Sequence, residues 1–231
     1  MIAVIAKFMG GLGNQMFQFA HAKAFADKNG LELQTAPWVG ERIFTLGGHN
    51  CARPHSKTAM TLAGYFQSQA DLIYTRADCR RWFEFSDEAK AICESLMGGT
   101  DNYAIAHLRR GDYAGAGYPV ISPKAYLDAA VEHHIDPNRL VFIGNERPWG
   151  GTSDPTISFL PDFYRMTKAE NLFRANSSFS FWAGVLGHGT VFAPLIDGLR
   201  GGIEHDNVPF VRGNHPRLAG FEFTTSLYLE E

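Results

Sequence analysis

The first 35 residues constrain the fold more than any other stretch, because they place a strand, a helix and a second strand in close succession. Residues 2–9 (IAVIAKFM) predict a buried strand, and the glycines that follow predict a tight turn. Residues 14–30 predict a helix with Asn14 as N-cap and Gly30 as C-cap, and residues 31–35 (LELQT) predict the next strand. Such a β-loop-α-β unit favours a parallel α/β sheet.

A second α/β series follows the Gly98–Gly99 pair. We expect strands at 102–108, 139–145, near 156–160, near 171–175 and at 190–194, and helices at 122–133, from about 162 and from about 177. Between the two series, residues 36–54 indicate a surface excursion, and residues 64–99 indicate a short strand-like entry followed by helical segments. The pattern predicts two small α/β halves joined near residue 100.

The composition excludes several classes of protein. The 21 Lys and Arg against 24 Asp and Glu give a net charge of −3, so no overall positive field favours nucleic acid or an anionic membrane. The cysteines (Cys51, Cys79 and Cys93) lack CxxC spacing, which argues against a disulfide framework and a structural zinc site. No apolar run reaches the roughly 18 to 20 residues that a transmembrane helix needs, and residues 1–8 resemble a strand more than a secretion signal. We expect a cytoplasmic protein and leave peripheral association with a membrane open.

Two adjacent arginines, Arg109 and Arg110, directly follow the strand expected at 102–108. The carboxyl ends of strands are where α/β proteins bind ligands. A guanidinium is always charged, and its planar fork of donors matches two phosphate oxygens, so the pair suits a diphosphate. The alternative is that Asp112 neutralises one arginine and the ion pair only pins the loop. The residues alone leave both interpretations open.

The segment GGLGNQ carries the glycines of the first turn: Gly10, Gly11 and Gly13. Because Glu32 follows about 20 residues later, the pattern is partly that of a dinucleotide-binding protein, although Met16 occupies the place of the third glycine. A second interpretation is that the glycines let the backbone approach a ligand, with the Asn14 amide at the helix N-terminus. The plainest interpretation is a tight turn capped by Asn14.

A third segment, ANSSFSFWAG (175–184), lies between a predicted strand and an apolar helix. Either Ser177 or Ser178 can cap that helix, and hydroxyls with free backbone N–H groups at a helix N-terminus also form a phosphate seat. Phe181 and Trp182 fit a core better than a cofactor site.

The acidic segment at residues 204–207 (EHDN) favours a solvated loop over a metal-ion site, and we expect no metal ion.

Together, four segments resemble blocks of the α-1,2-fucosyltransferases (glycosyltransferase family 11). GGLGNQMFQFAHAKAFA is similar to that family's N-terminal glycine turn, and GYFQSQADLI to its Gly-Tyr-aromatic-Gln-Ser segment. HLRRGDY is similar to its HxRRGDY motif, and DFYRMTKAENLFRANSSFSFWAGVLG to its Asn-Ser-Ser-Phe-Ser block. The blocks fall in one order between about residues 4 and 195, so the resemblance covers most of the chain.

The resemblance implies an α/β, GT-B-like fold in which two Rossmann-like domains face a cleft. Residues 1–100 would form the N-terminal, acceptor-side domain, and residues 101–231 the C-terminal domain that binds GDP-fucose. The implied activity is inverting, metal-independent transfer of L-fucose from GDP-β-L-fucose to a galactoside hydroxyl of an oligosaccharide or glycan acceptor. It implies no cofactor besides this co-substrate. The oligomeric state is not indicated.

Carried over by position, Arg109 would bind the β-phosphate and stabilise the leaving GDP, and Asp162 would contact guanine. His107 would lie beside the nucleotide, and Asn14 near the transferred sugar. The implied donor-binding residues are Asn14, His107, Arg109, Arg110, Asp162, Asn176, Ser177, Ser178 and Phe179, next to the glycine turn of Gly10, Gly11 and Gly13. The expected catalytic residues are Arg109 and Asp112, and Arg110 is expected to hold the loop with Asp112.

The chain departs from the family where Gly144 and Asn145 stand in place of two aspartates, so no role is carried over to an acidic pair. For the general base, Asp112 is a candidate, although holding the arginines is its favoured role, and Glu146 and Asp27 have weaker claims. Two other functions remain as alternatives. One is a catalytically idle protein that binds a GDP-sugar, and the other is an NAD-dependent Rossmann enzyme.

Overall fold

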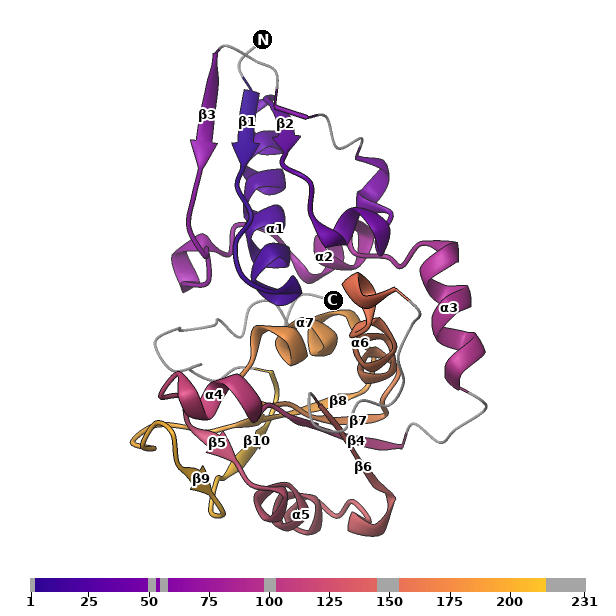
Figure 1. Cartoon of the computed structure of the whole chain (residues 1–231), viewed down its shortest axis with the longest axis vertical. Helices are drawn as coiled ribbons and strands as arrows, with labels where there is room; N and C mark the ends of the chain where they lie inside the picture. Colours follow the sequence, from indigo (N-terminus) through magenta and orange to yellow (C-terminus); the bar gives the residue numbers. More distant parts are fainter. Residues whose placement is uncertain (1–2, 50–52, 55–57, 98–102, 145–153, 215–231) are drawn as a thin grey trace.

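The computed structural model describes residues 3–49, 53–54, 58–97, 103–144 and 154–214, which build two α/β halves (Figure 1). The first half contains β1 (Ala3–Ala6), α1 (Leu12–Asn29), β2 (Glu32–Thr35), β3 (Ala59–Leu62), α2 (Arg76–Trp82) and α3 (Asp87–Met97). The second contains β4 (Ala104–Leu108), α4 (Gly111–Gly115), β5 (Val120–Ile121), α5 (Pro123–Glu132), β6 (Leu140–Gly144), α6 (Leu160–Thr167), β7 (Asn171–Phe173), α7 (Ser178–Leu186), β8 (Thr190–Pro194), β9 (Glu204–His205) and β10 (Phe210–Arg212). The predicted junction near residue 100 lies outside the described residues.

The first half is a small parallel sheet in the order β2-β1-β3. The chain leaves β1 through α1, adds β2 on one side, and later adds β3 on the other side. The first residue of β1, Ala3, pairs with Glu32 and with Ala59, so all three strands start at the same edge. The carboxyl end of β1, followed by the glycine turn, is therefore a point where the strand order reverses.

The second half is a larger sheet in the order β10-β8-β7-β4-β6, in which only β10 is antiparallel among the described strands. After β4 the chain adds β6 on one side, then crosses back to place β7 on the other. The carboxyl end of β4 is thus a second reversal point, and it leads directly into Arg109. A short parallel pair, β5 and β9, accompanies this sheet.

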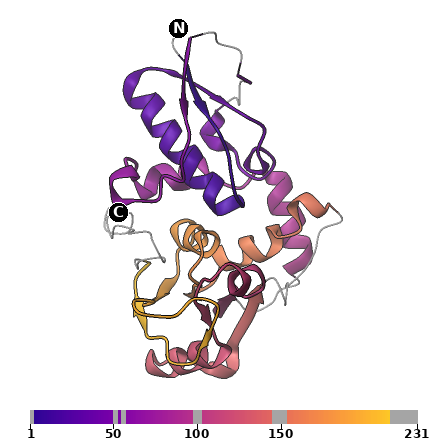
Figure 2. The same cartoon turned by 60° about the vertical axis from the view of Figure 1, so that its left-hand side comes forward.

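Helix α7 joins the two halves, because it packs against α1 and α2 as well as against α6 (Figures 1 and 2). Phe17 of α1 contacts both Phe181 and Trp182 of α7, with its ring centroid 5.2 and 4.9 Å from theirs. These side chains belong to one buried cluster that spans both halves. The interior of the first half therefore continues into the second, and burial of these large aromatic side chains stabilises the junction.

The carboxyl end of α7 is held by two arginines of α2. Arg76 Nε donates to the Val185 carbonyl at 3.1 Å, and Arg76 Nη2 donates to the Gly187 carbonyl at 2.9 Å. Arg80 Nη2 donates to the same Gly187 carbonyl at 2.6 Å. Cations at this position bind the terminal carbonyl oxygens and interact favourably with the negative end of the helix dipole.

Several local predictions are corrected. Helix α1 begins at Leu12 with Gly11 as its N-cap, so Asn14 is not the cap, whereas Gly30 ends the helix in the left-handed conformation as predicted. Residues 155–157 form a 3₁₀ helix and not a strand, because Asp154 and the following proline initiate a helical turn.

The segment at 36–49 is not a surface excursion. It forms short 3₁₀ helices whose large side chains, including Trp38, Ile43 and Phe44, are buried in the core. The strand-like entry at residue 64 is also wrong, because the strand of this region is β3, which ends at Leu62.

Two kinds of feature are absent from the described residues. No described helix has the length and the apolar composition needed to cross a bilayer. Within the same residues, no group of three or more His, Cys, Asp or Glu side chains is close enough to hold a metal ion.

Candidate active site

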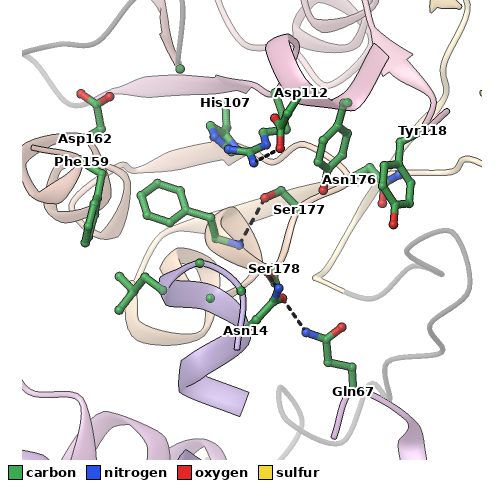
Figure 3. Close-up of a pocket in the computed structure, with 18 of the residues that line it drawn as sticks. Asn14, Gln67, His107, Asp112, Tyr118, Phe159, Asp162, Asn176, Ser177 and Ser178 are labelled. Atoms are coloured by element: carbon green, nitrogen blue, oxygen red, sulfur yellow. Dashed lines mark hydrogen bonds and ion pairs between the residues drawn. The ribbon is translucent and has the colours of Figure 1, made fainter. Parts of the chain in front are cut away.

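Both reversal points open into one cavity of about 520 Å³ (Figure 3). It is lined by Gly10, Gly11, Leu12, Gly13, Asn14, Tyr65, Gln67, His107, Arg109, Asp112, Tyr113, Tyr118, Gly144, Phe159, Asp162, Asn176, Ser177, Ser178 and Phe179. The volume suits a small-molecule ligand, and the carboxyl ends of parallel strands are where such ligands bind. The residues implied as donor-binding or catalytic line it together with the glycine turn, and Arg110 is the exception among them.

The N-termini of α1 and α7 meet at this cavity, and Gly13 lets them do so. A Cβ atom on Gly13 would lie 2.5 Å from the Ser178 carbonyl carbon and 2.6 Å from the Phe179 nitrogen. No side chain fits that space without moving the α7 backbone. Gly10 adopts a φ of +76°, a conformation that favours glycine and turns the chain sharply before the helix.

Asn14 connects the two halves through its side chain. Its Oδ1 accepts hydrogen bonds from Ser178 Oγ at 2.9 Å and from Gln67 Nε2 at 2.8 Å (Figure 3). Since Gly11 caps the helix instead, the Asn14 side chain is available for these partners. Asn14 therefore lines the cavity, and its predicted capping role is wrong.

The α7 turn presents polar groups where the α1 turn presents glycines. Ser177 is the N-cap, and its Oγ accepts a hydrogen bond from the Phe179 N–H at 3.3 Å. Asn176, Ser177 and Ser178 all line the cavity. Two helix N-termini with their positive dipole ends face the same space, which favours an anion.

The two arginines take different partners, and Asp112 pairs with one of them, as the alternative interpretation proposed. Arg109 Nη2 lies 2.8 Å from Asp112 Oδ2 and lines the cavity, whereas Arg110 Nη2 lies 2.7 Å from Glu204 Oε2 on β9. The expectation that Asp112 would hold Arg110 is therefore wrong. Arg110 has a backbone φ of −117° and ψ of −96°, and its side chain bonds to β9, so it is not a lining residue of this cavity.

Arg109 is further ordered by Tyr113. Its guanidinium carbon lies 5.1 Å from the centroid of the Tyr113 ring, a cation–π distance. With Asp112 on one side and an aromatic ring beside it, the guanidinium is held in one place at the edge of the cavity. A fixed fork of donors of this kind suits a phosphate group.

His107 is the last but one residue of β4 and is buried beside the cavity. Burial, and then the nearby Arg109 and Arg174, lower the pKa of His107 from 6.5 to about 3. Its Nδ1 has no hydrogen-bond partner within the described part of the chain. A neutral imidazole with one unused ring nitrogen at a cavity wall is suited to a ligand hydrogen bond. The Tyr126 hydroxyl donates to the His107 carbonyl at 2.8 Å and fixes this part of the strand.

Asp162 and Phe159 mark one end of the cavity (Figure 3). The Asp162 side chain lies in the first turn of α6 and is buried. Phe179 contacts Phe159, with centroids 5.9 Å apart, and His107, with centroids 5.7 Å apart. This end combines aromatic surface with a buried carboxylate, which accepts hydrogen bonds from a planar base bearing N–H groups.

The other acidic candidates are not at this cavity. Glu32 is the first residue of β2 and pairs with Ala3 at the start of β1, at the opposite edge of the sheet from the glycine turn. A strand of four residues separates those edges by about 13 Å, so Glu32 cannot hold a ribose there as a dinucleotide-binding carboxylate does. Asp27 forms an ion pair with Lys23 on α1 and lines a separate, shallower cavity. Glu146 and Asn145 lie outside the described residues.

Sequence reasoning missed several lining residues, namely Leu12, Tyr65, Gln67, Tyr113, Tyr118, Gly144 and Phe159. Tyr65, Gln67 and Tyr113 belong to segments that resemble family blocks. The resemblance indicated that these segments matter, but it did not indicate which of their side chains line the cavity. Gly144 pairs with Leu108 across the two strands, and a Cβ on it would lie 2.0 Å from the Leu108 carbonyl oxygen. A side chain at this position would therefore overlap the backbone of β4.

No protein-family model and no curated protein matches the sequence of this chain. Solved structures do match. NodZ α-1,6-fucosyltransferase co-crystallised with GDP superposes with a TM-score of 0.55 and 12% identity, over 90% of this chain and 97% of that chain. Fucosyltransferase NodZ from Bradyrhizobium gives a TM-score of 0.56 and 11% identity, over 90% and 98%. NodZ soaked with GDP-fucose gives 0.52 and 11% over the same shares. The chain therefore has the α/β, GT-B-like fold of these structures, as its sequence predicted.

Proposed function

We propose that this protein binds GDP-β-L-fucose in the cavity between its halves and transfers L-fucose, with inversion, to a hydroxyl of a glycan. The observation that carries the proposal is the convergence of Arg109, two helix N-termini and buried Asp162 on one cavity. The four sequence blocks and the fold that the chain shares with NodZ, which has been studied with GDP and GDP-fucose, support it. The N-terminal half would face the acceptor, and the half from residue 101 would hold the nucleotide.

In this proposal guanine lies at the end of the cavity formed by Asp162 and Phe159. The carboxylate accepts the N1–H and amino hydrogens of the base, and the ring of Phe159 covers its apolar face. His107 stays neutral at physiological pH, because its pKa is about 3, and it hydrogen-bonds the nucleotide through a ring nitrogen. The diphosphate then lies between Arg109 and the α7 turn of Asn176, Ser177, Ser178 and Phe179.

The chemistry requires stabilisation of the leaving group. The acceptor oxygen bonds to the anomeric carbon of fucose while the bond from that carbon to the diphosphate breaks, and the hydroxyl proton passes to water or to the departing diphosphate. During this exchange the sugar becomes oxocarbenium-like and negative charge develops on the diphosphate. Donors that are already fixed at that position lower the barrier. Arg109 and the helix N-termini supply them, so we propose transfer without a metal ion. EDTA should leave the rate unchanged, and strict dependence on Mg²⁺ or Mn²⁺ would contradict this mechanism.

Asp112 lines the cavity but is paired with Arg109, so we propose that it positions the guanidinium. An Asp112→Asn variant should then keep the shape of the pH–rate profile while its rate falls, and Asp112→Glu should recover part of that rate. If Asp112 is instead the general base, the Asn variant loses the acid limb of the profile.

Calorimetric titration with GDP, GDP-fucose, UDP and NAD⁺ tests the binding step. Binding of the guanine nucleotides with no response to UDP or NAD⁺ supports the proposal, and failure to bind either guanine nucleotide excludes it.

The transfer step is tested with galactoside and N-acetylglucosamine acceptors, followed by linkage analysis of the product. The sequence blocks favour an α-1,2 linkage to galactose, whereas the NodZ enzymes are α-1,6-fucosyltransferases. Nucleotide binding without hydrolysis or transfer would identify an idle GDP-sugar-binding protein.

A further inference from the structure

The cavity extends beyond the groups that the nucleotide would use. Figure 3 shows Asp162 and Phe159 at one end, Ser177 and Ser178 in the middle, and Tyr118 with Gln67 at the other end. With the base at the first end and the diphosphate in the middle, the third region has no assigned ligand. Its chemistry differs from the rest, because it combines the exposed ring of Tyr118 with the buried amide of Gln67.

Tyr118 is large, exposed and held in place. Its side chain is 41% exposed, although its backbone N–H donates to the Tyr113 carbonyl at 3.0 Å and its own carbonyl accepts from the Gly202 N–H at 2.8 Å. The Tyr113 ring packs beside it, with centroids 4.9 Å apart. A ring that is already ordered loses little conformational entropy when a ligand packs on it.

Tyr65 reaches the same cavity from the first half and is 43% exposed. The next residue, Phe66, has a φ of +50°, and its ring stacks on His21 at 4.2 Å with an interplanar angle of 6°. This unusual backbone conformation is held by the stacked ring, and the loop thereby leaves Tyr65 exposed and Gln67 buried. Gln67 is fixed in turn by its hydrogen bond to Asn14.

We propose that Tyr65, Tyr118 and Gln67 form the acceptor subsite and bind the terminal sugar ring of an oligosaccharide; this inference rests on the fucosyl transfer proposed above. A pyranose has an apolar C–H face and a rim of hydroxyl groups. Tyrosine rings pack against the apolar face, and the phenol and amide groups bond to the hydroxyls. Tyrosine is suited to this role because it combines a rigid apolar ring with a polar tip.

The position of the subsite fits transfer. Asn14 Oδ1 accepts from Gln67 on the acceptor side and from Ser178 on the diphosphate side. One side-chain amide thus separates the two regions. A sugar against Gln67 and a fucosyl group beside Ser178 are neighbours, so an acceptor hydroxyl can approach the fucose carbon that loses GDP.

The test uses the full chain with Tyr65→Ala, Tyr118→Ala and the double variant. Leu127→Ala serves as the matched control, because Leu127 is also exposed but lies on α5 and does not line the cavity. Three quantities are measured: GDP affinity by calorimetry, hydrolysis of GDP-fucose without acceptor, and KM for the acceptor. A fourth measurement, binding of oligosaccharides to the protein alone by saturation-transfer NMR, does not depend on the nucleotide.

We expect the double variant to raise the acceptor KM by about tenfold or more, and to lose the oligosaccharide NMR signal. Its GDP affinity and hydrolysis rate should remain within about twofold of wild type. An unchanged acceptor KM and NMR signal would overturn the inference, as would a loss of GDP affinity equal to the loss of transfer. If wild type binds no guanine nucleotide, the proposed function fails, and the NMR arm still decides whether these tyrosines bind sugar.

Discussion

The two strand-to-helix turns that meet at the cavity are built in opposite ways. The turn before α1 is nearly free of side chains, with Gly11 as N-cap and Gly13 against α7. The turn before α7 carries hydroxyl groups, and Ser177 Oγ caps its helix. The first turn therefore supplies space and a close backbone contact, and the second supplies hydrogen-bonding groups. An anion site made in this way is complete only when both halves are present.

The largest effect should come from removing the cation beside the two turns. Arg109 supplies a full positive charge to the proposed leaving group, and the helix N-termini supply only partial charges. Arg109→Ala should therefore lower kcat by about 10²- to 10³-fold, which corresponds to a loss of about 2.7 to 4 kcal/mol of transition-state stabilisation. Arg110→Ala is the matched control, because Arg110 is paired with Glu204 and does not line the cavity. Steady-state kinetics and thermal unfolding of both variants provide the measurement. Parallel loss of activity and stability in the two variants would give both arginines a structural role.

The contact between the turns can be broken at Gly13. Gly13→Ala should lower the free energy of unfolding by about 1 to 3 kcal/mol, because the methyl group overlaps the α7 backbone. Gly11→Ser is the control, since a Cβ at Gly11 meets no atom within 4 Å and serine is a favourable N-cap. Urea denaturation should place Gly11→Ser within about 0.5 kcal/mol of wild type. Equal stability of both variants would show that the helices do not need this close approach.

A pH titration examines the strand that leads to Arg109. The folded pKa of His107 is about 3 and its ordinary value is 6.5, so between these values the unfolded chain binds a proton that the folded chain does not. Its stabilising effect is complete above about pH 6.5 and is lost as the pH falls toward 3, at up to about 1.4 kcal/mol per pH unit. His107→Asn should therefore lose about 2 kcal/mol less than wild type between pH 7.5 and pH 5. Urea unfolding at both pH values measures this, and identical losses would contradict it.

The smallest effect concerns the two caps themselves. Ser177→Ala should destabilise the protein by about 1 kcal/mol, whereas Ser177→Gly, which gives α7 the type of cap that α1 has, should cost only about 0.3 kcal/mol. Urea denaturation of the two variants measures the difference. If alanine and glycine are equivalent at this position, the Ser177 hydroxyl is not capping α7, and its role is confined to the cavity.

Sequence predicted the parts of this fold that depend on local pattern. The first β-loop-α-β unit and the helix beginning after Ser122 follow from apolar periodicity, caps and glycines, and the structure contains both. Most of the candidate site residues, which were named from the family resemblance, line one cavity, because they lie at the ends of strands or the starts of helices.

The errors come from contacts between residues distant in the chain. Arg110 pairs with Glu204, which is 94 positions away, so local spacing favoured Asp112 instead. The Asn14 side chain was assigned to its own helix, although its partners are Gln67 and Ser178 in other segments. Tertiary partners override local preference at these positions, and periodicity contains no information about them.

The hydrogen bonds from Arg76 and Arg80 to the carboxyl end of α7 limit how the cavity can admit a ligand. A hinge that swung the halves apart would have to pull Arg76 and Arg80 off the Gly187 carbonyl and expose Trp182, all at once. A ligand of this cavity would then enter and leave through the rim, with movements of loops and not of whole halves. The radius of gyration measured by small-angle scattering should accordingly be the same with and without GDP.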